Sequence, residues 1–133
     1  MKALKVLLAL GLIYVGVVVL FESLLGYFQP DGDYTMVITT TDADGNRNDR
    51  VLAKVESDGS LYAAANHWPR AWYRQALANP AVSVNIDGES ADYAAVPVEG
   101  AEHDRVNNAR PLGIGFQILT GFPPRYFLRL EPR

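Results

Sequence analysis

The segment between residues 66 and 74 holds the side chains best suited to chemistry in this chain. His67 belongs to the residue type that titrates near neutral pH, so it could donate a proton to a reduced substrate. Arg70 and Arg74 lie four residues apart, which places them on one helix face, where they could bind a phosphate or a carboxylate. With the aromatic ring of Trp68 beside them, these residues predict one wall of a binding site.

The same segment also has purely structural interpretations. Trp72 and Tyr73 would pack a helix onto a sheet, because aromatic side chains contribute large burial energies. Arg70 and Arg74 would form a solvated pair, and His67 would lie in a surface loop. The sequence leaves these interpretations open beside the functional ones.

Composition excludes several classes of function. The chain has no cysteine, which excludes disulfides, thiol catalysis and cysteine-bound metals, and two well-separated histidines do not suggest a zinc site. The 12 basic and 15 acidic side chains become 10 and 14 once Lys2, Lys5 and Glu22 are set aside, and this negative balance argues against a nucleic-acid partner. No phosphate-binding Gly-Lys-Ser/Thr loop, Gly-x-Ser-x-Gly elbow or His-Glu-x-x-His motif is present. Such a sequence favours chemistry carried by a bound cofactor.

Stretches rich in β-branched and aromatic residues, separated by turn residues, predict six antiparallel strands. Asp58-Gly59 and Asp87-Gly88 are each suited to the positive φ angles of a tight hairpin turn. Successive hairpins with an inserted helix predict a mainly β fold with helices (α+β), arranged as a closed or partly closed β-barrel. The expected strands cover residues 34–41, 50–57, 60–65, 81–86, 89–98 and 125–132.

Two helical segments are expected between these strands. Pro69 suits the first turn of a helix over 70–78, and Asn79-Pro80 ends it. A weaker helical segment is expected from Glu99 to Asn108. Residues 110–125 are punctuated by glycine and proline without clear periodicity, so we assign no element to them.

Residues 6–21 form a charge-free apolar run, and "SLLGYF" extends it to about residue 28. This approaches the roughly 20 residues that a helix needs to cross a bilayer. We therefore predict a membrane anchor helix over residues 1–29 and a β-barrel domain over 30–133. Two alternatives stay open: a cleaved signal peptide, although "FESLLGYFQP" has no small-x-small cleavage pattern, and a core helix, although the run is apolar on all faces.

The flanking charges predict the orientation of this helix. Lys2 and Lys5 precede the apolar run, whereas Glu22, Asp31 and Asp33 follow it. The positive-inside rule then keeps the N-terminus in the cytoplasm and places the globular domain outside. A helix that lies in the membrane interface would instead leave the domain in the cytoplasm.

Three segments, "ITTTDADGNRNDRVL", "LYAAANHWPRAWYRQALANPAVSVNIDG" and "FLRLEP", together resemble the deazaflavin-dependent nitroreductase family over about residues 34–131. The members of that family are split β-barrel proteins related to the flavin-binding pyridoxamine phosphate oxidases. The most specific match is Trp72-Tyr73 followed by Ala78-Asn79-Pro80, which is similar to the family's Trp-Tyr helix ending in Ala-Asn-Pro before a strand. The resemblance implies a split β-barrel of about six strands, a deazaflavin coenzyme or FMN as cofactor, and a homodimer that completes the site.

The resemblance also implies the site residues. In that family the loop after the threonine strand binds the coenzyme's phosphate, and the segment before the Trp-Tyr helix lies beside the ring system. The two segments fall on residues 42–45 and 64–67 of this chain. For an oxidoreductase of this kind we expect Tyr73 and His67 to be the catalytic residues. The expected cofactor-binding residues are Thr40, Thr41, Gly45, Arg47, Arg50, Ala64, Ala65, Asn66, Trp68 and Arg70.

The expected phosphate loop departs from the family pattern, and two main hypotheses follow. Asp42 and Asp44 stand where basic and hydroxyl side chains are usual, and their charges would repel a phosphate unless Arg47 or Arg50 compensates. The first hypothesis is a membrane-anchored oxidoreductase that transfers hydride to a quinone or a similar lipophilic acceptor. The second is a noncatalytic barrel that holds an apolar or haem-like ligand at the membrane surface, or a small subunit of a membrane complex.

Overall fold

A computed structural model describes residues 1–27, 34–68 and 70–133 of the chain. Its elements are α1 (Lys2–Tyr27), β1 (Thr35–Thr41), β2 (Arg47–Ser57), β3 (Ser60–Ala65), α2 (Ala71–Ala78), β4 (Ala81–Ile86), β5 (Glu89–Pro97), α3 (Gly100–Ala109), α4 (Ile114–Thr120) and β6 (Tyr126–Pro132). Two sequence expectations, the helix break at residues 30–33 and the helix start at Pro69, fall outside the described residues.

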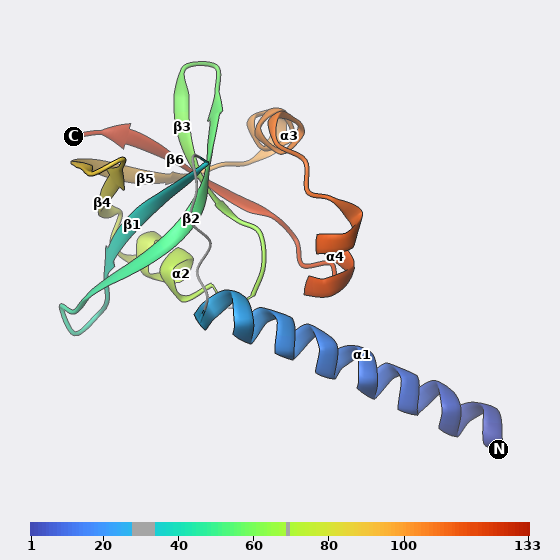
Figure 1. Ribbon diagram of the computed structural model, residues 1–133. Coiled ribbons are helices and arrows are strands. Elements are labelled where there is room, and N and C mark those ends of the chain that lie inside the picture. The colour runs from blue at the N-terminus through green and yellow to red at the C-terminus, as the bar shows by residue number, and fades with distance from the viewer. Residues whose placement is uncertain (28–33, 69) are drawn as a thin grey trace.

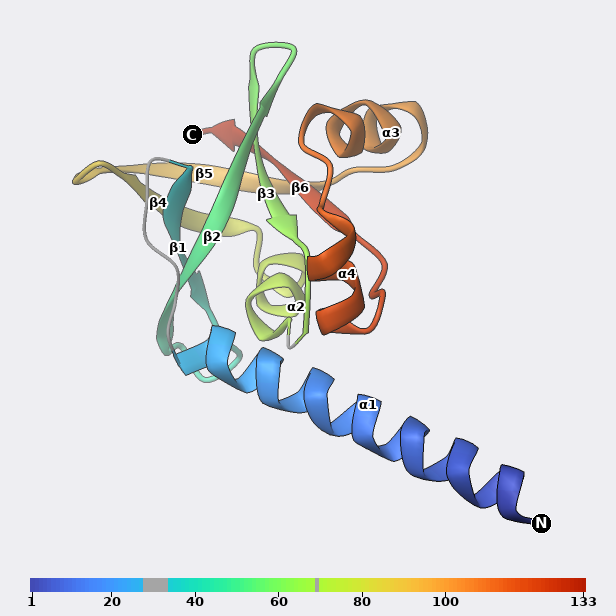
Figure 2. The same ribbon diagram turned by 45° about the vertical axis from the view of Figure 1, so that its right-hand side comes forward.

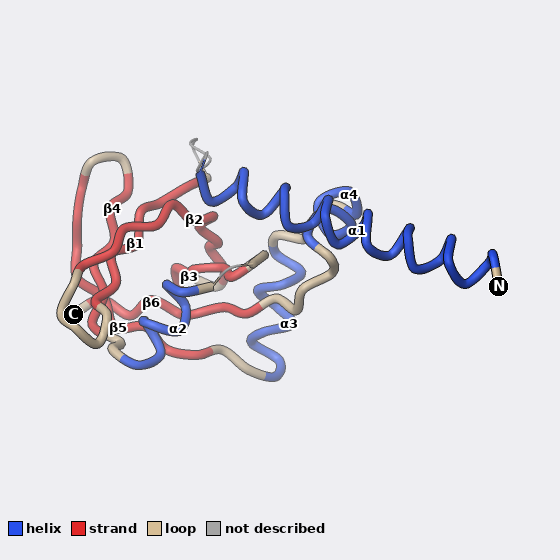
Figure 3. The backbone as a smooth tube through the Cα atoms, turned by 90° about the horizontal axis from the view of Figure 1, so that it is seen from below, coloured by secondary structure: helices blue, strands red, loops and turns tan. Residues whose placement is uncertain are grey.

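Six antiparallel strands close into a barrel in the order β1-β2-β3-β6-β5-β4 (Figure 1). The barrel closes where β1 pairs with β4, in the register Val37 to Asn85, and where β3 pairs with β6, in the register Ala63 to Leu128. Figure 3 shows the barrel from below, with α1, α3 and α4 toward one side and α2 apart from them near β5. The predicted α+β split barrel is confirmed.

Both Asp-Gly turns adopt the backbone that the sequence predicts. Asp58 and Gly59 have φ angles of 52° and 78°, and Asp87 and Gly88 have φ angles of 53° and 88°. Positive φ at both central residues matches the twist of the flanking strands, and glycine adopts it at little cost. The two hairpins therefore form where they were expected.

Alternate residues of the strands fill the barrel interior. In β1 the buried positions are Met36, Ile38 and Thr40, as the two-residue period of a strand requires. Helix α2 contacts β1 and β5, and its Trp72 and Ala76 are buried in the same cluster as Met36. Trp72 thus packs the helix onto the barrel, as its structural interpretation predicted.

A charged network around Glu102 holds helix α3 against the barrel. The Glu102 carboxylate accepts hydrogen bonds of 2.6 and 2.7 Å from Nη1 of Arg129 in β6, and one of 2.8 Å from the hydroxyl of Tyr62 in β3. The hydrogen bond from Arg129, followed by that from Tyr62, holds the pKa of Glu102 below its usual value. The network therefore favours the ionised carboxylate in the folded protein.

We expect Glu102 to make stability depend on pH in the acidic range. A carboxyl whose pKa is lowered by folding stabilises the protein above its ordinary pKa of 4.5, and this contribution is lost as the pH falls below that value. Denaturant unfolding at neutral pH and at acidic pH should therefore show a smaller acid destabilisation in Glu102→Gln than in the parent protein. Glu89→Gln, at an exposed position beside a turn, is the control and should respond to acid as the parent does. Equal responses in both variants would rule out Glu102 as the cause.

Helix α1 extends from the barrel as a single rod, with the N-terminus at its far end (Figure 1). Its span Lys2–Leu25 is long and apolar enough to cross a membrane, and none of its most apolar stretch is buried against the protein. A core helix would be mostly buried, so that alternative is wrong. A membrane span and a signal sequence both agree with the finding.

The region that the sequence left unassigned contains α4, which lies beside the C-terminal half of α1 (Figure 2). The hydroxyl of Tyr14 in α1 donates a 2.7 Å hydrogen bond to the carbonyl of Ile118, and the rings of Phe21 and Phe116 pack edge to face at 5.9 Å. Helix α4 ends at Gly121, whose φ of 78° is the left-handed conformation that commonly terminates helices. Helix α4 therefore packs on α1 although its sequence shows no clear helical periodicity.

Candidate functional site

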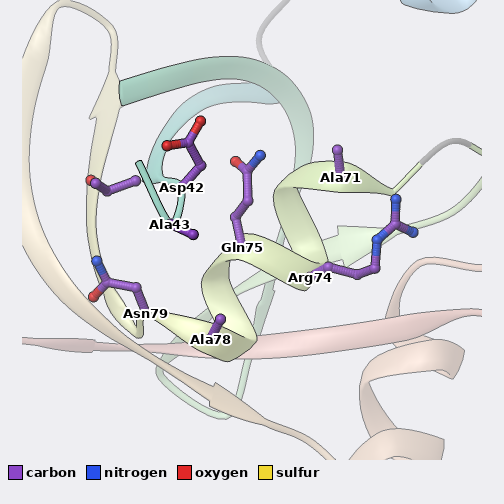
Figure 4. Close-up of a pocket in the computed structure, with 8 residues that line it drawn as sticks. Asp42, Ala43, Ala71, Arg74, Gln75, Ala78 and Asn79 are labelled. Carbon is purple, nitrogen blue, oxygen red and sulfur yellow. The ribbon is translucent and has the colours of Figure 1, made fainter. Parts of the chain in front are cut away.

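A groove of about 630 Å³ lies between the turn that follows β1 and helix α2 (Figure 4). Its volume is in the range of small-molecule sites. Figure 4 shows Gln75 reaching between the turn and Ala71, whereas Arg74 extends away from Asp42. Small alanine side chains on both walls leave the space between them open. The lining residues are Thr41, Asp42, Ala43, Ala71, Arg74, Gln75, Ala78 and Asn79.

Asp42 organises the turn that forms one wall of this groove. Its Oδ1 accepts hydrogen bonds from the backbone N–H groups of Asp44 at 3.0 Å and Asn46 at 2.9 Å, and its Oδ2 accepts longer ones from the side-chain amides of Asn46 and Asn48. These hydrogen bonds lower the pKa of Asp42, and the one from the Asn46 backbone N–H has the largest effect. The carboxylate thus occupies N–H donors with which such a turn would otherwise hold a phosphate.

Two arginines of β2 lie near the same turn. Arg47 is exposed and stands opposite Thr41 in the β1–β2 register. Arg50 is half-buried and lines a second cavity of about 170 Å³, to which Gln75 also contributes. The hydroxyl of buried Thr40 donates a 2.6 Å hydrogen bond to Oε1 of Gln75 and so orients that side chain between the two cavities. Guanidinium groups are therefore available beside the groove, although the turn itself is anionic.

A buried carboxylate, Glu22, joins α1 to the segment that precedes α2. Glu22 is only 6% exposed, and its Oε1 accepts a 2.9 Å hydrogen bond from the Trp68 backbone N–H. Its Oε2 lies 2.7 Å from Nδ1 of His67, which is also 2.9 Å from the Trp68 carbonyl. Both neighbours are acceptors, so Nδ1 carries a proton. The imidazole is thereby fixed against α1, outside the set of residues that line the groove.

Arg70 is buried beside this junction. It is 3% exposed, and its guanidinium stacks between the rings of Trp68 at 4.5 Å and Tyr126 at 5.1 Å. It donates hydrogen bonds to the carbonyls of His67 and Pro124, and its Nη1 finds no partner among the residues that the structure describes. Burial lowers the pKa of Arg70.

Asn66 is held by Arg125, which precedes β6. Nε of Arg125 donates to Oδ1 of Asn66 at 2.7 Å, and its Nη1 donates to Oδ1 of Asn107 at 3.0 Å and to the Arg110 carbonyl at 2.6 Å. The guanidinium also lies 4.8 Å from the centre of the Phe127 ring. Burial lowers the pKa of Arg125 to about 10, so the side chain stays charged at neutral pH. One arginine thus links three separate segments of the chain.

The remaining sequence-predicted residues lie in or against the core. Ala64 and Ala65 are buried on β3, opposite Phe127 and Tyr126 of β6. Tyr73 is half-buried and stacks on Tyr126 with ring centres 5.5 Å apart. Burial raises the pKa of Tyr73, which keeps its phenol protonated at neutral pH.

The structure therefore separates the sequence-predicted residues into two main groups. One group surrounds the groove and its turn and comprises Thr40, Thr41, Gly45, Arg47 and Arg50. The other lies between α1, α2 and β6 and comprises Asn66, His67, Trp68 and Arg70.

Sequence reasoning missed three residues that shape these groups: Glu22, Gln75 and Arg125. Glu22 carried one signal, because it is the one acidic residue in the sequence of α1. Arg125 carried no local signal, since its partners lie 15 to 59 residues away along the chain.

A model of the F420H(2)-dependent quinone reductase family matches residues 17–111, which include the turn at 42–45 and the whole of α2. The chain belongs to this family. F420 is a deazaflavin coenzyme, so membership of the F420H(2)-dependent quinone reductase family confirms the resemblance drawn from the Trp-Tyr helix.

Several solved structures are similar in fold to this member of the F420H(2)-dependent quinone reductase family. One described as a domain-swapped dimer is 25% identical, covers 74% of this chain and 80% of its own, and has a TM-score of 0.59. The F420-H2-dependent reductase FDR-A is 26% identical, with coverages of 71% and 93% and a TM-score of 0.55. HutZ, a heme storage protein from Vibrio cholerae, is 20% identical, with coverages of 76% and 82% and a TM-score of 0.52, and supports the fold alone. A comparison with curated proteins gives no match.

Proposed function

We propose that the protein is a membrane-anchored reductase that uses the deazaflavin coenzyme F420 to reduce a quinone or a similar lipophilic acceptor. The observation that carries this proposal is the groove between the Asp42 turn and α2, because the family resemblance implies this turn at the coenzyme's phosphate. The second implied segment, residues 64–67, does not line the groove. When bound, the coenzyme supplies the hydride. The side chains of the protein hold and orient the ligands and supply a proton.

The groove has the volume of a small-molecule site, and guanidinium groups in and beside it offset the anionic turn. Asp42 already occupies backbone N–H donors of the turn, so the phosphate would be held by guanidinium groups instead. Arg74 lines the groove, and Arg47 and Arg50 lie beside its turn. Thr41 lines the groove and Gly45 lies in its turn, so both would add contacts there. Residues 64–66, Trp68 and Arg70, also inferred from the sequence, lie outside the groove and would contact only a part of the coenzyme that extends beyond it.

Tyr73 and His67 are the proposed proton donors to the acceptor. The phenol of Tyr73 stays protonated because burial raises its pKa, so it can donate a hydrogen bond. His67 is held in one ring orientation by Glu22 and the Trp68 carbonyl. The ring of Trp68, which is 44% exposed, offers an apolar surface for the acceptor beside these groups.

The lipophilic acceptor is proposed because α1 would anchor the protein in the membrane where such acceptors dissolve. Residues 1–29 would form the anchor and residues 30–133 the barrel domain, with the N-terminus in the cytoplasm and the barrel outside, as the flanking charges predict. A homodimer is proposed as well, supported by the similar structure described as a domain-swapped dimer.

Coenzyme binding tests the proposal. Full-length protein in detergent is titrated with F420, and in a second arm with FMN, while ligand fluorescence is followed. We expect F420 to bind, and Arg74→Ala to weaken it roughly tenfold to a hundredfold, because a charged hydrogen bond contributes about 1.5–3 kcal/mol.

Arg133→Ala removes an exposed arginine that does not line the groove, and it should leave F420 affinity unchanged. Equal affinities of Arg74→Ala and Arg133→Ala would place the coenzyme outside the groove. A lack of F420 binding at concentrations on the order of tens of micromolar would sink the reductase proposal.

A noncatalytic barrel that binds an apolar or haem-like ligand is the second candidate, and the Asp42 turn favours it. A carboxylate that occupies the anion-binding N–H groups opposes a phosphate but has no such effect on a neutral ligand. Binding of hemin together with a lack of F420 binding would support this candidate.

A further inference from the structure

The contacts between α4 and α1 fall within the charge-free part of the apolar helix. Tyr14 bonds the carbonyl of Ile118, and Phe21 packs against Phe116. Val18 approaches Gly121 so closely that a Cβ added there would lie 3.4 Å from Cγ1 of the valine. Helix α4 is therefore fixed along the stretch of α1 between Tyr14 and Phe21.

If α1 crosses a bilayer, as proposed above, its contacts with α4 place α4 at the depth of the lipid chains. A helix rises about 1.5 Å per residue, so Tyr14 lies about 12 Å from Glu22 along the axis. A hydrocarbon layer about 30 Å thick that begins at Lys5 would end near residue 25 of a helix perpendicular to the membrane. Because Tyr14 and Phe21 both fall inside this interval, the segment packed against them falls inside it too.

The surface of α4 suits a lipid environment. Residues 112–124 contain no charged side chain. Phe122 is 56% exposed although its φ of 53° is unusual for an aromatic residue, so its ring is presented outward at some conformational cost. The exposed large apolar residues of this segment are Ile114, Ile118, Leu119 and Phe122.

Several polar groups near the end of α4 are hydrogen-bonded within the segment, which lowers the cost of placing them in lipid. The Thr120 hydroxyl donates to the Phe116 carbonyl at 2.8 Å, and the backbone N–H of Phe122 donates to the Gln117 carbonyl at 2.9 Å. The Gln117 side-chain amide donates to the Leu112 carbonyl at 3.1 Å. These bonds reduce the number of polar groups in this segment that depend on water.

We propose that α4 and Phe122 insert into the lipid bilayer beside the C-terminal half of α1, so the partner of this surface is the acyl region of the membrane. The inference rests on the proposed membrane span of α1 and adds a second insertion to it. Insertion would bring Trp68 close to the membrane interface, where tryptophan is favoured, and would place the 66–68 segment within reach of an acceptor dissolved in the bilayer.

Site-directed spin labelling tests this insertion. The chain has no cysteine, so single cysteines can be introduced without removing any native residue of that type. Labels at Ile118→Cys and Phe122→Cys probe α4, Leu12→Cys probes the exposed middle of α1, and Glu56→Cys probes water on the β2–β3 hairpin. Full-length protein is placed in phosphatidylcholine vesicles containing phosphatidylglycerol, and collision rates with oxygen and with a water-soluble nickel chelate are measured.

We expect the labels at residues 118, 122 and 12 to show an oxygen-to-nickel accessibility ratio several-fold above that at residue 56. A ratio at both α4 positions equal to that at residue 56, with residue 12 in lipid, would overturn the insertion and leave the anchor standing. Water exposure at residue 12 would overturn the proposed span and the insertion with it. Immobile α4 labels shielded from both reagents would mean that a second copy of the chain covers the surface, which also overturns insertion. None of these outcomes depends on coenzyme binding.

Discussion

Replacing Arg125 with methionine is expected to lower the free energy of unfolding by roughly 3–5 kcal/mol, because a half-buried guanidinium loses three hydrogen bonds of the charged type, each contributing about 1.5–3 kcal/mol. Methionine keeps an unbranched stem but cannot donate to Asn66, Asn107 or the Arg110 carbonyl. These acceptors are half-buried, so part of the loss is made up by water. Denaturant unfolding followed by tryptophan fluorescence measures the change.

Arg133→Met is the matched control for this variant, because Arg133 is exposed near the C-terminus. It should change the free energy of unfolding by less than about 0.5 kcal/mol. If Arg125→Met were no less stable than Arg133→Met, the three segments would be held together without the guanidinium, and the role given to Arg125 would be wrong.

Replacing Glu22 with leucine is expected to destabilise the protein by roughly 2–4 kcal/mol, because two partly buried donors lose their acceptor. The donors are the Trp68 backbone N–H and the Nδ1–H of His67. The histidine keeps a partial partner in the Trp68 carbonyl, which limits the loss. Unfolding is measured on full-length protein in detergent, with fluorescence of Trp68 and Trp72 as the signal.

Ser23→Ala is the control for Glu22→Leu. The Ser23 hydroxyl is exposed and donates only to the Val19 carbonyl of its own helix, at 2.7 Å. We expect this change to be nearly neutral, whereas Glu22→Gln, which keeps one carbonyl acceptor, should lie between the two. Equal stability of Glu22→Leu and Ser23→Ala would show that Glu22 does not couple α1 to the barrel.

The strands and helix α2 could be predicted from the sequence because their signals are local. Alternating apolar residues and two Asp-Gly turns define the hairpins within short stretches of chain. The predicted start of the second strand was three residues late, since polar Arg47, Asn48 and Asp49 extend the pairing with β1. Helix α4 could not be predicted, because its packing partners on α1 lie about a hundred residues earlier.

The contacts within the candidate site could be predicted from the sequence only in part. The expected solvated pair of Arg70 and Arg74 is not formed, because the N-cap position turns Arg70 into the protein, where two aromatic rings and two carbonyls hold it. The acidity of the 42–45 turn was visible in the sequence. That Asp42 binds the turn's own N–H groups required the folded backbone.

The junction at Glu22 also determines how the protein can be divided. A truncated, water-soluble version made by removing residues 1–27 would lose not only the apolar rod but also the acceptor for His67 and for the Trp68 backbone. It would expose the faces of Phe116 and Gly121 that now pack on α1. The C-terminal half of α1 therefore packs on the barrel domain, and a fragment without it would present an altered 66–68 segment.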